Sequence, residues 1–205
     1  TGGALDLADY YGGMGDVGYY PDWYNHTINY LGEVDPVTGR GIANPDVNVM
    51  MWSWCGQAAG YTEQQMIDQY LNPMSQLESV YYNVKFVYMT CHLNGTGLEG
   101  NLHLRNEQIR NFCQANNKIL YDFADIETYD PDGVYYGELF PTDACNYDAS
   151  GDGYTDQDGD PAVPGYESGD RNWAIDWQDS HIEGVDWYSC GAAHSYPLNA
   201  NMKAY

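Results

Sequence analysis

Four polar residues stand where they could act on a substrate. Gln57, His92 and Asn94 each follow closely after a short apolar run, and His194 lies in the segment CGAAHS near the end of the chain. Histidine is the usual acid–base group near neutral pH, and side-chain amides can hold an oxyanion. If the apolar runs are parallel strands, their carboxyl ends meet at one edge of a sheet, where α/β proteins bind ligands. These four residues are therefore the candidate catalytic residues.

The acidic segment DASGDGYTDQDGD supplies a second candidate site. Oxygen-bearing residues at alternate positions, with glycines that permit tight turns, are typical of a loop that wraps Ca²⁺. Gly159 stands where an EF-hand loop has its bidentate glutamate, so we expect a looser calcium-binding loop. The alternative is a solvated acidic loop. The expected calcium ligands are Asp148, Ser150, Asp152, Tyr154, Asp156, Asp158 and Asp160.

Strands and helices that would position these residues alternate along the chain. Apolar runs at 47–54, 84–90 and 118–126 predict buried strands, and helices are expected near 62–81 and 99–116. In the first helix, Thr62 and Gln65 form a capping-box pattern, and Asn72-Pro73 predicts a break or kink. Strands that alternate with helices predict an α/β fold, in which right-handed crossovers join the strands of a parallel sheet.

The remaining segments carry few regular signals. Residues 1–46 are rich in glycine, tyrosine and turn-forming residues, and residues 130–172 read as a loop insertion. With 205 residues, we expect a single domain over 1–205. The start at Thr1 and the ending NANMKAY, which reads like the beginning of a helix, predict a processed or partial chain.

The charge of the chain restricts its partners and its location. Thirty acidic residues and seven basic residues give a net charge of −23, which repels nucleic-acid backbones. No apolar run is long enough to cross a membrane. Bound divalent cations or a salty medium would screen such a charge, so we expect an extracellular or cell-surface protein. N-glycans are expected at the sequons of Asn25 and Asn94.

Five cysteines agree with that location. Cys113 falls on the apolar face of the helix near 99–116 and is predicted to be a buried free thiol. The other four allow three disulfide pairings, of which we favour Cys55–Cys91 with Cys145–Cys190. The chain has no CxxC or CxxCH motif, which excludes the classical zinc and c-type haem sites.

The order of elements resembles the SGNH/GDSL hydrolase superfamily over residues of about 1–126 and 173–205. The segment MMWSWCGQ lies where that family has its asparagine block, and CGAAHS lies where it has its DxxH block. The resemblance implies a three-layer flavodoxin-like fold and a serine that attacks an acyl carbon. His194 would take the proton of that serine, and Gln57 would help to hold the oxyanion.

Two departures from the family pattern concern the catalytic groups. Gly191 stands at the aspartate position of the DxxH block. The chain has no GDS motif, because Val17 follows Gly15-Asp16 where the serine would be. The resemblance therefore places the serine just before Thr1, and the chain is expected to be inactive without it.

Two functions follow from these observations. The first is an extracellular SGNH-like hydrolase that cleaves an ester, with an acylated glycan as one candidate substrate. The alternative is a non-catalytic calcium-binding structural or assembly protein, such as a surface-layer or filament subunit, that forms homo-oligomers and reuses the fold.

Overall fold

A parallel sheet of three strands forms the centre of the protein. The computed structural model describes residues 15–151, 153, 155 and 170–189. The strands lie in the sheet in their chain order, with Met50 beside Phe86 and Tyr88 beside Leu120. The predicted α/β class and the parallel pairing are confirmed. The strands are β1 (Val49–Met51), β2 (Lys85–Met89) and β3 (Ile119–Tyr121).

Each strand is shorter than the apolar run that predicted it. The last run, 118–126, ends in a helix because Asp122 accepts a hydrogen bond from the backbone N–H of Asp125 and so caps a new first turn. That helix is α5 (Phe123–Thr128). Helix α5 begins directly after β3, at the carboxyl edge of the sheet. Side chains of α5 can therefore take part in a site at that edge.

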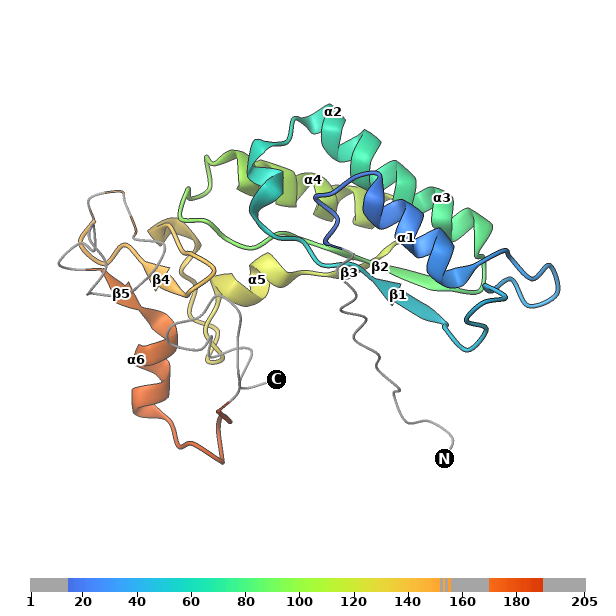
Figure 1. Ribbon diagram of the computed structural model, residues 1–205. Helices are drawn as coiled ribbons and strands as arrows, with labels where there is room; N and C mark the ends of the chain where they lie inside the picture. The colour runs from blue at the N-terminus through green and yellow to red at the C-terminus, as the bar shows by residue number, and fades with distance from the viewer. Residues whose placement is uncertain (1–14, 152, 154, 156–169, 190–205) are drawn as a thin grey trace.

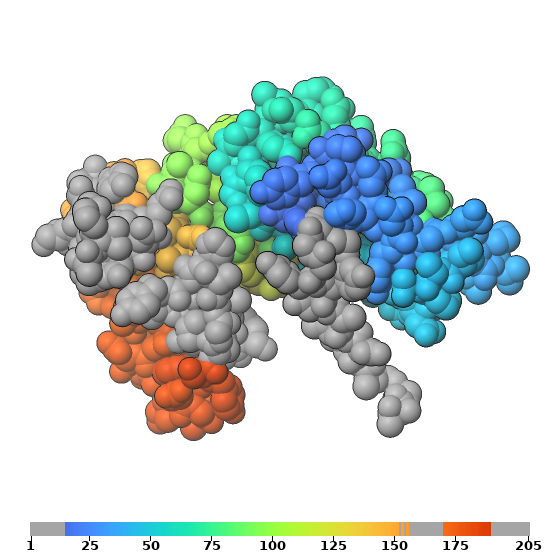
Figure 2. All heavy atoms as spheres, in the orientation of Figure 1, coloured from blue at the N-terminus to red at the C-terminus, as the bar shows by residue number. Residues whose placement is uncertain are grey.

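The helices between the strands all cover one face of the sheet (Figure 1). Strands in sequential order need crossovers of the same direction, and right-handed crossovers then fall on the same side. Figure 2 shows the atoms of α1, α2 and α3 as a continuous surface across the top of the molecule. Helix α1 (Asp22–Leu31) precedes β1. The helices between the strands are η1 (Gly56–Gly60), α2 (Glu63–Met66), η2 (Ile67–Leu71), α3 (Asn72–Val80) and α4 (Asn101–Ala115).

The two faces of the sheet differ in burial. Phe86 and Tyr88 point toward the helices and are 1% and 0% exposed. On the opposite face, Val49, Met51 and Ile119 are 52%, 48% and 48% exposed. The described residues therefore form two layers, and the third layer of the flavodoxin-like arrangement stays a prediction.

Of the predicted break or kink at Asn72-Pro73, the break does not occur, because the helix runs on to Val80, but a π-helical turn interrupts the regular α-helix there. Pro73 has no N–H to donate to the carbonyl of Gln69, and its ring crowds the preceding turn. The chain accommodates the ring with the wider π-helical turn η2 just before it. The carbonyl of Gln69 instead accepts a hydrogen bond from the indole nitrogen of Trp23 at 3.2 Å. The capping box of Thr62 and Gln65 is present as predicted.

Helix α1 is an element that the sequence did not reveal. Its buried residues Trp23, Thr27 and Leu31 follow a helical spacing, but the middle one is polar. Thr27 tolerates burial because its hydroxyl donates to the carbonyl of Trp23 at 2.9 Å and accepts from the Trp52 indole at 2.8 Å. A stripe interrupted by a polar residue is a weak helix signal.

Aromatic side chains fill the core between α1, the crossover helices and the sheet. Tyr70 lies at its centre, with its ring 4.9 Å from that of Trp54 and 5.9 Å from that of Tyr88, measured between centroids. Its hydroxyl accepts a hydrogen bond from the N–H of Met89 at 2.8 Å and lies 3.3 Å from the carbonyl of Met89. Tyr70 thereby bonds the backbone of β2 at its carboxyl end.

The described part of the insertion at 130–172 contains short regular elements. These are η3 (Gly137–Leu139), β4 (Asn146–Tyr147) and β5 (Arg171–Asn172), and α6 (Trp173–Ser180) follows. Strands β4 and β5 pair antiparallel, and a small aromatic cluster forms around Trp173. The N–H of Asp143 donates to the carbonyl of Leu93 at 3.1 Å, which attaches the insertion to the sheet edge.

The cysteines correct one prediction and confirm another. Cys55 and Cys91 are both free thiols, so the favoured pairing between them is wrong. Cys91 is fully buried and held inward by backbone bonds to Asn106, whereas Cys55 is half-buried at the start of η1. Cys113 is a buried free thiol, as predicted. Cys190 lies outside the described residues, so its pairing with Cys145 stays a prediction.

Candidate functional site at the carboxyl edge of the sheet

The carboxyl end of β2 is held in place by a side chain of α4. Oδ1 of Asn106 accepts a hydrogen bond from the N–H of Cys91 at 2.8 Å, and its Nδ2 donates to the carbonyl of Cys91 at 3.2 Å. Both groups are buried, so these bonds replace ladder bonds that the strand no longer makes. The next residue, His92, therefore leaves the sheet in a defined direction.

His92 forms a close pair with Glu127 of α5. Nδ1 of His92 lies 3.0 Å from Oε1 of Glu127, and Oε2 of Glu127 accepts a hydrogen bond from the N–H of Leu93 at 2.7 Å. Glu127 is 1% exposed. The ring of His92 also packs edge-on against Phe123, with centroids 4.9 Å apart. Both atoms of the carboxylate are thus used to orient the imidazole and the backbone beside it.

The charges around His92 favour its protonated form. Burial alone would lower the pKa of His92, but the hydrogen bond and the charge of Glu127 outweigh that effect and raise it above 6.5. The charges of Asp143 and Asp16 act in the same direction. Burial raises the pKa of Glu127 above 4.5, against the opposing effect of its bonds to His92 and Leu93. The pair therefore binds protons more readily than either group does in water.

Gln57 reaches the same edge through Asp16. Its Nε2 donates to Oδ2 of Asp16 at 3.0 Å, and Oδ1 of Asp16 accepts from the N–H of Gly18 at 2.8 Å. Gly18 permits this contact, because a Cβ there would lie 2.5 Å from the Gln57 side chain. The charge of Asp16 also contributes to the raised pKa of His92.

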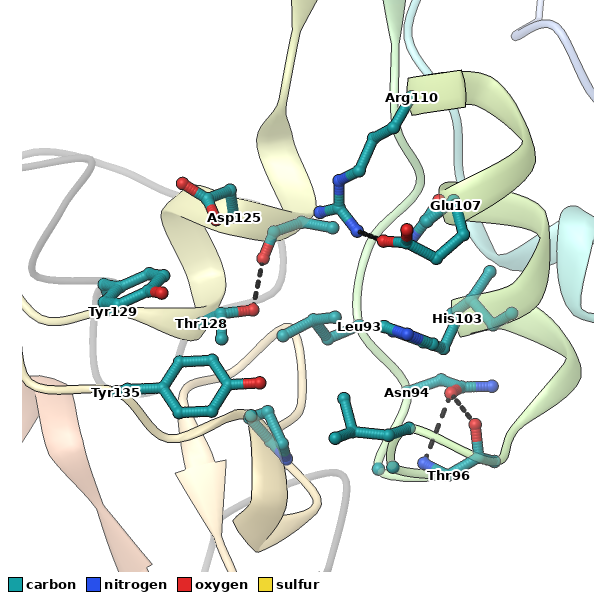
Figure 3. A pocket seen from close by; sticks show the side chains of 18 residues that line it. Leu93, Asn94, Thr96, His103, Glu107, Arg110, Asp125, Thr128, Tyr129 and Tyr135 are labelled. Atoms are coloured by element: carbon teal, nitrogen blue, oxygen red, sulfur yellow. Dashed lines mark hydrogen bonds and ion pairs between the residues drawn. The ribbon is translucent and has the colours of Figure 1, made fainter. Parts of the chain in front are cut away.

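Asn94 lies farther along the segment that leaves β2. Its Oδ1 accepts from the hydroxyl of Thr96 at 2.6 Å and from the N–H of Thr96 at 3.3 Å, which closes a tight turn. Its backbone pairs with that of Thr142 in the insertion. Asn94 lines a cavity together with Leu93, the residue after His92 (Figure 3). His194 lies outside the described residues.

Sequence reasoning missed the two carboxylates that organise this edge. Glu127 is part of the segment FADIE, which follows β3, but a glutamate in a short helix after a strand gives no sign that it is buried. Asp16 lies in a glycine-rich loop. The end of a predicted strand indicates which residues lie near the sheet edge. It does not indicate which side chains contact a histidine there, because those contacts depend on tertiary packing.

Two of the expected calcium ligands, Asp148 and Ser150, are described. Asp148 is 3% exposed, and its carboxylate accepts bonds from the N–H groups of Gly151 and Gly153 at 2.6 and 2.7 Å. The Ser150 hydroxyl lies 3.0 Å from Oδ1. The loop therefore turns around the first aspartate, and no group of three or more metal-binding side chains occurs among the described residues. The other expected ligands, Asp152, Tyr154, Asp156, Asp158 and Asp160, lie outside them.

The two sequons differ in their surroundings. Asn25 is exposed on α1, but Thr27 of the same sequon is buried. In the other sequon, Thr96 is exposed and Asn94 is half-buried at the cavity. Glycosylation at either position stays a prediction.

Comparisons with known proteins give no further guide to this edge. No protein-family model matches the chain, and neither a curated protein nor a solved structure shows significant similarity to it. None of the described helices is both long enough and apolar enough to cross a bilayer.

Proposed function

We propose that the protein is an SGNH-like hydrolase that cleaves acyl esters, with the His92–Glu127 pair as its acid–base group. The 3.0 Å contact between His92 Nδ1 and the buried carboxylate of Glu127 is the observation that supports this proposal. A carboxylate that accepts a hydrogen bond from the Nδ1–H fixes the tautomer in which Nε2 of the neutral ring accepts a proton. The pair also lies at the carboxyl edge of a parallel sheet, where α/β enzymes hold their substrates.

In this mechanism His92 acts on the attacking oxygen. Its Nε2 removes the proton from a hydroxyl as that oxygen bonds to the acyl carbon, and the carbonyl electrons move onto the oxyanion. The ring then returns the proton to the leaving alcohol as the oxyanion collapses and the C–O bond breaks, which leaves the acyl group on the attacking oxygen. Water, deprotonated by the same ring, then attacks that ester and releases the acid. Glu127 stabilises the imidazolium formed between the two steps. The resemblance assigns the attacking hydroxyl to a serine before Thr1.

Gln57 is the proposed amide donor to the oxyanion. One N–H of its Nε2 is directed to Asp16, and the other is available for a substrate oxygen. His194 is the base that the family resemblance implies, whereas His92 is a histidine whose partner in the structure is a buried carboxylate. The two assignments are therefore separable by experiment.

The decisive test compares variants of the natural full-length product on p-nitrophenyl acetate, which needs few contacts beyond the acyl group. We expect His92→Gln to lower kcat/KM by about 10² to 10⁴, as for loss of a general base. His26→Gln, on α1, is the matched control and should retain full activity. If His92→Gln is as active as the wild type while His194→Gln is inactive, the role assigned to His92 is wrong. Absence of turnover by the wild type would refute ester hydrolysis.

Calcium binding by an extracellular assembly protein is the second candidate function. Its support is Asp148, which is buried and surrounded by N–H donors in the manner of a first loop ligand. Carboxylate oxygens of this kind are the ligands that Ca²⁺ prefers in proteins. Gel filtration with calcium and with chelator tests the assembly: dissociation of a defined oligomer by chelator would favour this function, and a monomer in both conditions would exclude it.

A further inference from the structure

A cavity of about 260 Å³ lies between α4, α5 and the loops that leave β2 and enter η3 (Figure 3). Leu93 and Thr128 line it, while Glu127, which lies between Ala124 and Thr128 in α5, turns toward His92. A chain neighbour of each member of the proposed acid–base pair thus lines the cavity.

Two tyrosine rings form one side of the cavity. Tyr129 and Tyr135 lie with their ring centroids 5.1 Å apart and are 36% and 45% exposed. Figure 3 shows both rings across the cavity from His103 and Glu107 of α4, with the Tyr135 hydroxyl directed inward. One side is therefore aromatic, and the opposite side carries hydrogen-bonding groups.

Glycines let the loops close around this space. A Cβ at Gly137 would lie 2.2 Å from the hydroxyl of Tyr135, and a Cβ at Gly97 would lie 2.8 Å from the ring of Phe140. Gly97 also has φ of +65°, a conformation that other residues rarely adopt. Both positions need glycine for the tyrosine and loop walls to stand where they do.

The charges at the cavity disfavour an anionic ligand. Its arginine, Arg110, donates to both oxygens of Asp122 at 2.7 and 2.8 Å and to Glu107 at 2.6 Å. The guanidinium charge is therefore neutralised by its own partners. Glu107 and Asp125 leave the lining with no positive excess, and carboxylates are good acceptors for hydroxyl groups.

Size and chemistry together define the ligand. A cavity of this volume lies just below the usual range for small-molecule sites, so it holds one ring and not a long chain. Aromatic faces pack against the C–H groups that project from one face of a saturated ring, and the carboxylate, amide and hydroxyl groups opposite bond its hydroxyls. We propose that this cavity binds a neutral sugar ring and so selects an acylated glycan as substrate, an assignment that rests on the proposed ester hydrolysis.

Binding of sugars without an acyl group tests the cavity separately from catalysis. The probes are the methyl glycosides of glucose, galactose and xylose, measured by saturation-transfer NMR and calorimetry with the wild-type protein. We expect at least one to bind in the millimolar range, and Tyr135→Ala to weaken binding about tenfold through loss of the aromatic wall. Tyr135→Phe keeps the ring and should bind within about threefold of wild type, which also guards against a folding defect.

A control variant and a control ligand separate failure of the sugar site from failure of the proposed ester hydrolysis. Tyr82→Ala, which removes an exposed tyrosine near Pro36, is the control and should bind as the wild type does. Cyclohexanol has a ring but one hydroxyl, and binding as tight as that of the sugars would overturn a sugar site. Failure of every glycoside to bind would also overturn it, even if p-nitrophenyl acetate is hydrolysed. Sugar binding without hydrolysis of any ester would support the cavity and refute the proposed function.

Discussion

The side chain of Asn106 bonds both backbone groups of Cys91, one as acceptor and one as donor. A single residue of α4 thus ends β2 and sets the direction in which His92 leaves the sheet. Because both backbone groups are buried, neither has water as a substitute partner.

Asn106→Asp is expected to destabilise the protein. The carboxylate still accepts from the N–H of Cys91, but it cannot donate to the carbonyl and instead repels it. We expect a loss of about 1–3 kcal/mol in the free energy of unfolding, measured with urea. Asn101→Asp on the same helix is the control: it loses two donated bonds where Asn106→Asp loses one, but Asn101 is exposed and water replaces them. Equal losses in both variants would contradict the role of Asn106.

The rate of ester hydrolysis should depend on pH through His92. The base must be neutral, and its pKa is raised above 6.5 mainly by Glu127, with Asp143 and Asp16 adding to the effect. We expect kcat/KM to rise with pH and to reach half its maximum above pH 6.5. In Glu127→Gln this midpoint should move to lower pH, because the main source of the increase is removed. A midpoint that is unchanged or higher in Glu127→Gln would contradict the assignment.

Stability should also fall as pH rises, for the same two groups. The folded protein binds protons at His92 and Glu127 more tightly than the unfolded chain does, since both pKa values are raised. The stabilisation from Glu127 is complete below pH 4.5 and that from His92 is complete below pH 6.5, and each is lost as pH rises through the folded pKa. The free energy of unfolding of wild type minus that of Glu127→Gln should therefore decrease from about pH 4 to about pH 8. An increase over that range would refute this sign.

Tyr70→Phe tests the contact that holds β2 to the aromatic core. The substitution keeps the ring contacts but leaves the buried N–H of Met89 without its 2.8 Å acceptor. We expect a loss of about 1–3 kcal/mol, measured by urea unfolding. Tyr82→Phe removes a hydroxyl that donates to the exposed carbonyl of Pro36 and should cost less than about 0.5 kcal/mol.

Calcium should stabilise the protein if the acidic loop binds it. A ligand that binds only the folded state raises the melting temperature by mass action, so added calcium should raise Tm and chelator should lower it. Asp148→Asn should abolish this difference, whereas Asp46→Asn, outside the loop, should leave it intact. A Tm that is the same in excess chelator and in calcium would exclude the site.

The sequence predicted the parallel sheet because three apolar runs, each separated by a helical pattern, have few other solutions. It also predicted that Gln57 and His92 follow the ends of strands. In the structure Gln57 lies in η1 after β1, and His92 follows β2. It did not reveal Glu127 or Asp16, because a carboxylate becomes a partner through burial, and burial depends on residues distant in the chain. The sequence also could not show why the helix continues past Pro73: Trp23, about 50 residues earlier, takes the place of the missing N–H.

The order β1-β2-β3 has a consequence for how the molecule is made. Each strand pairs with the one synthesised just before it, so a ribosome releases every new strand to a neighbour that already exists. No later strand has to insert between two strands that are already paired. Each pairing brings together two strands that are separated in the chain only by the helices of one crossover. Synthesis from the amino end therefore lays down the described sheet one strand at a time. The edge that carries His92 and Glu127 is completed when α5 emerges.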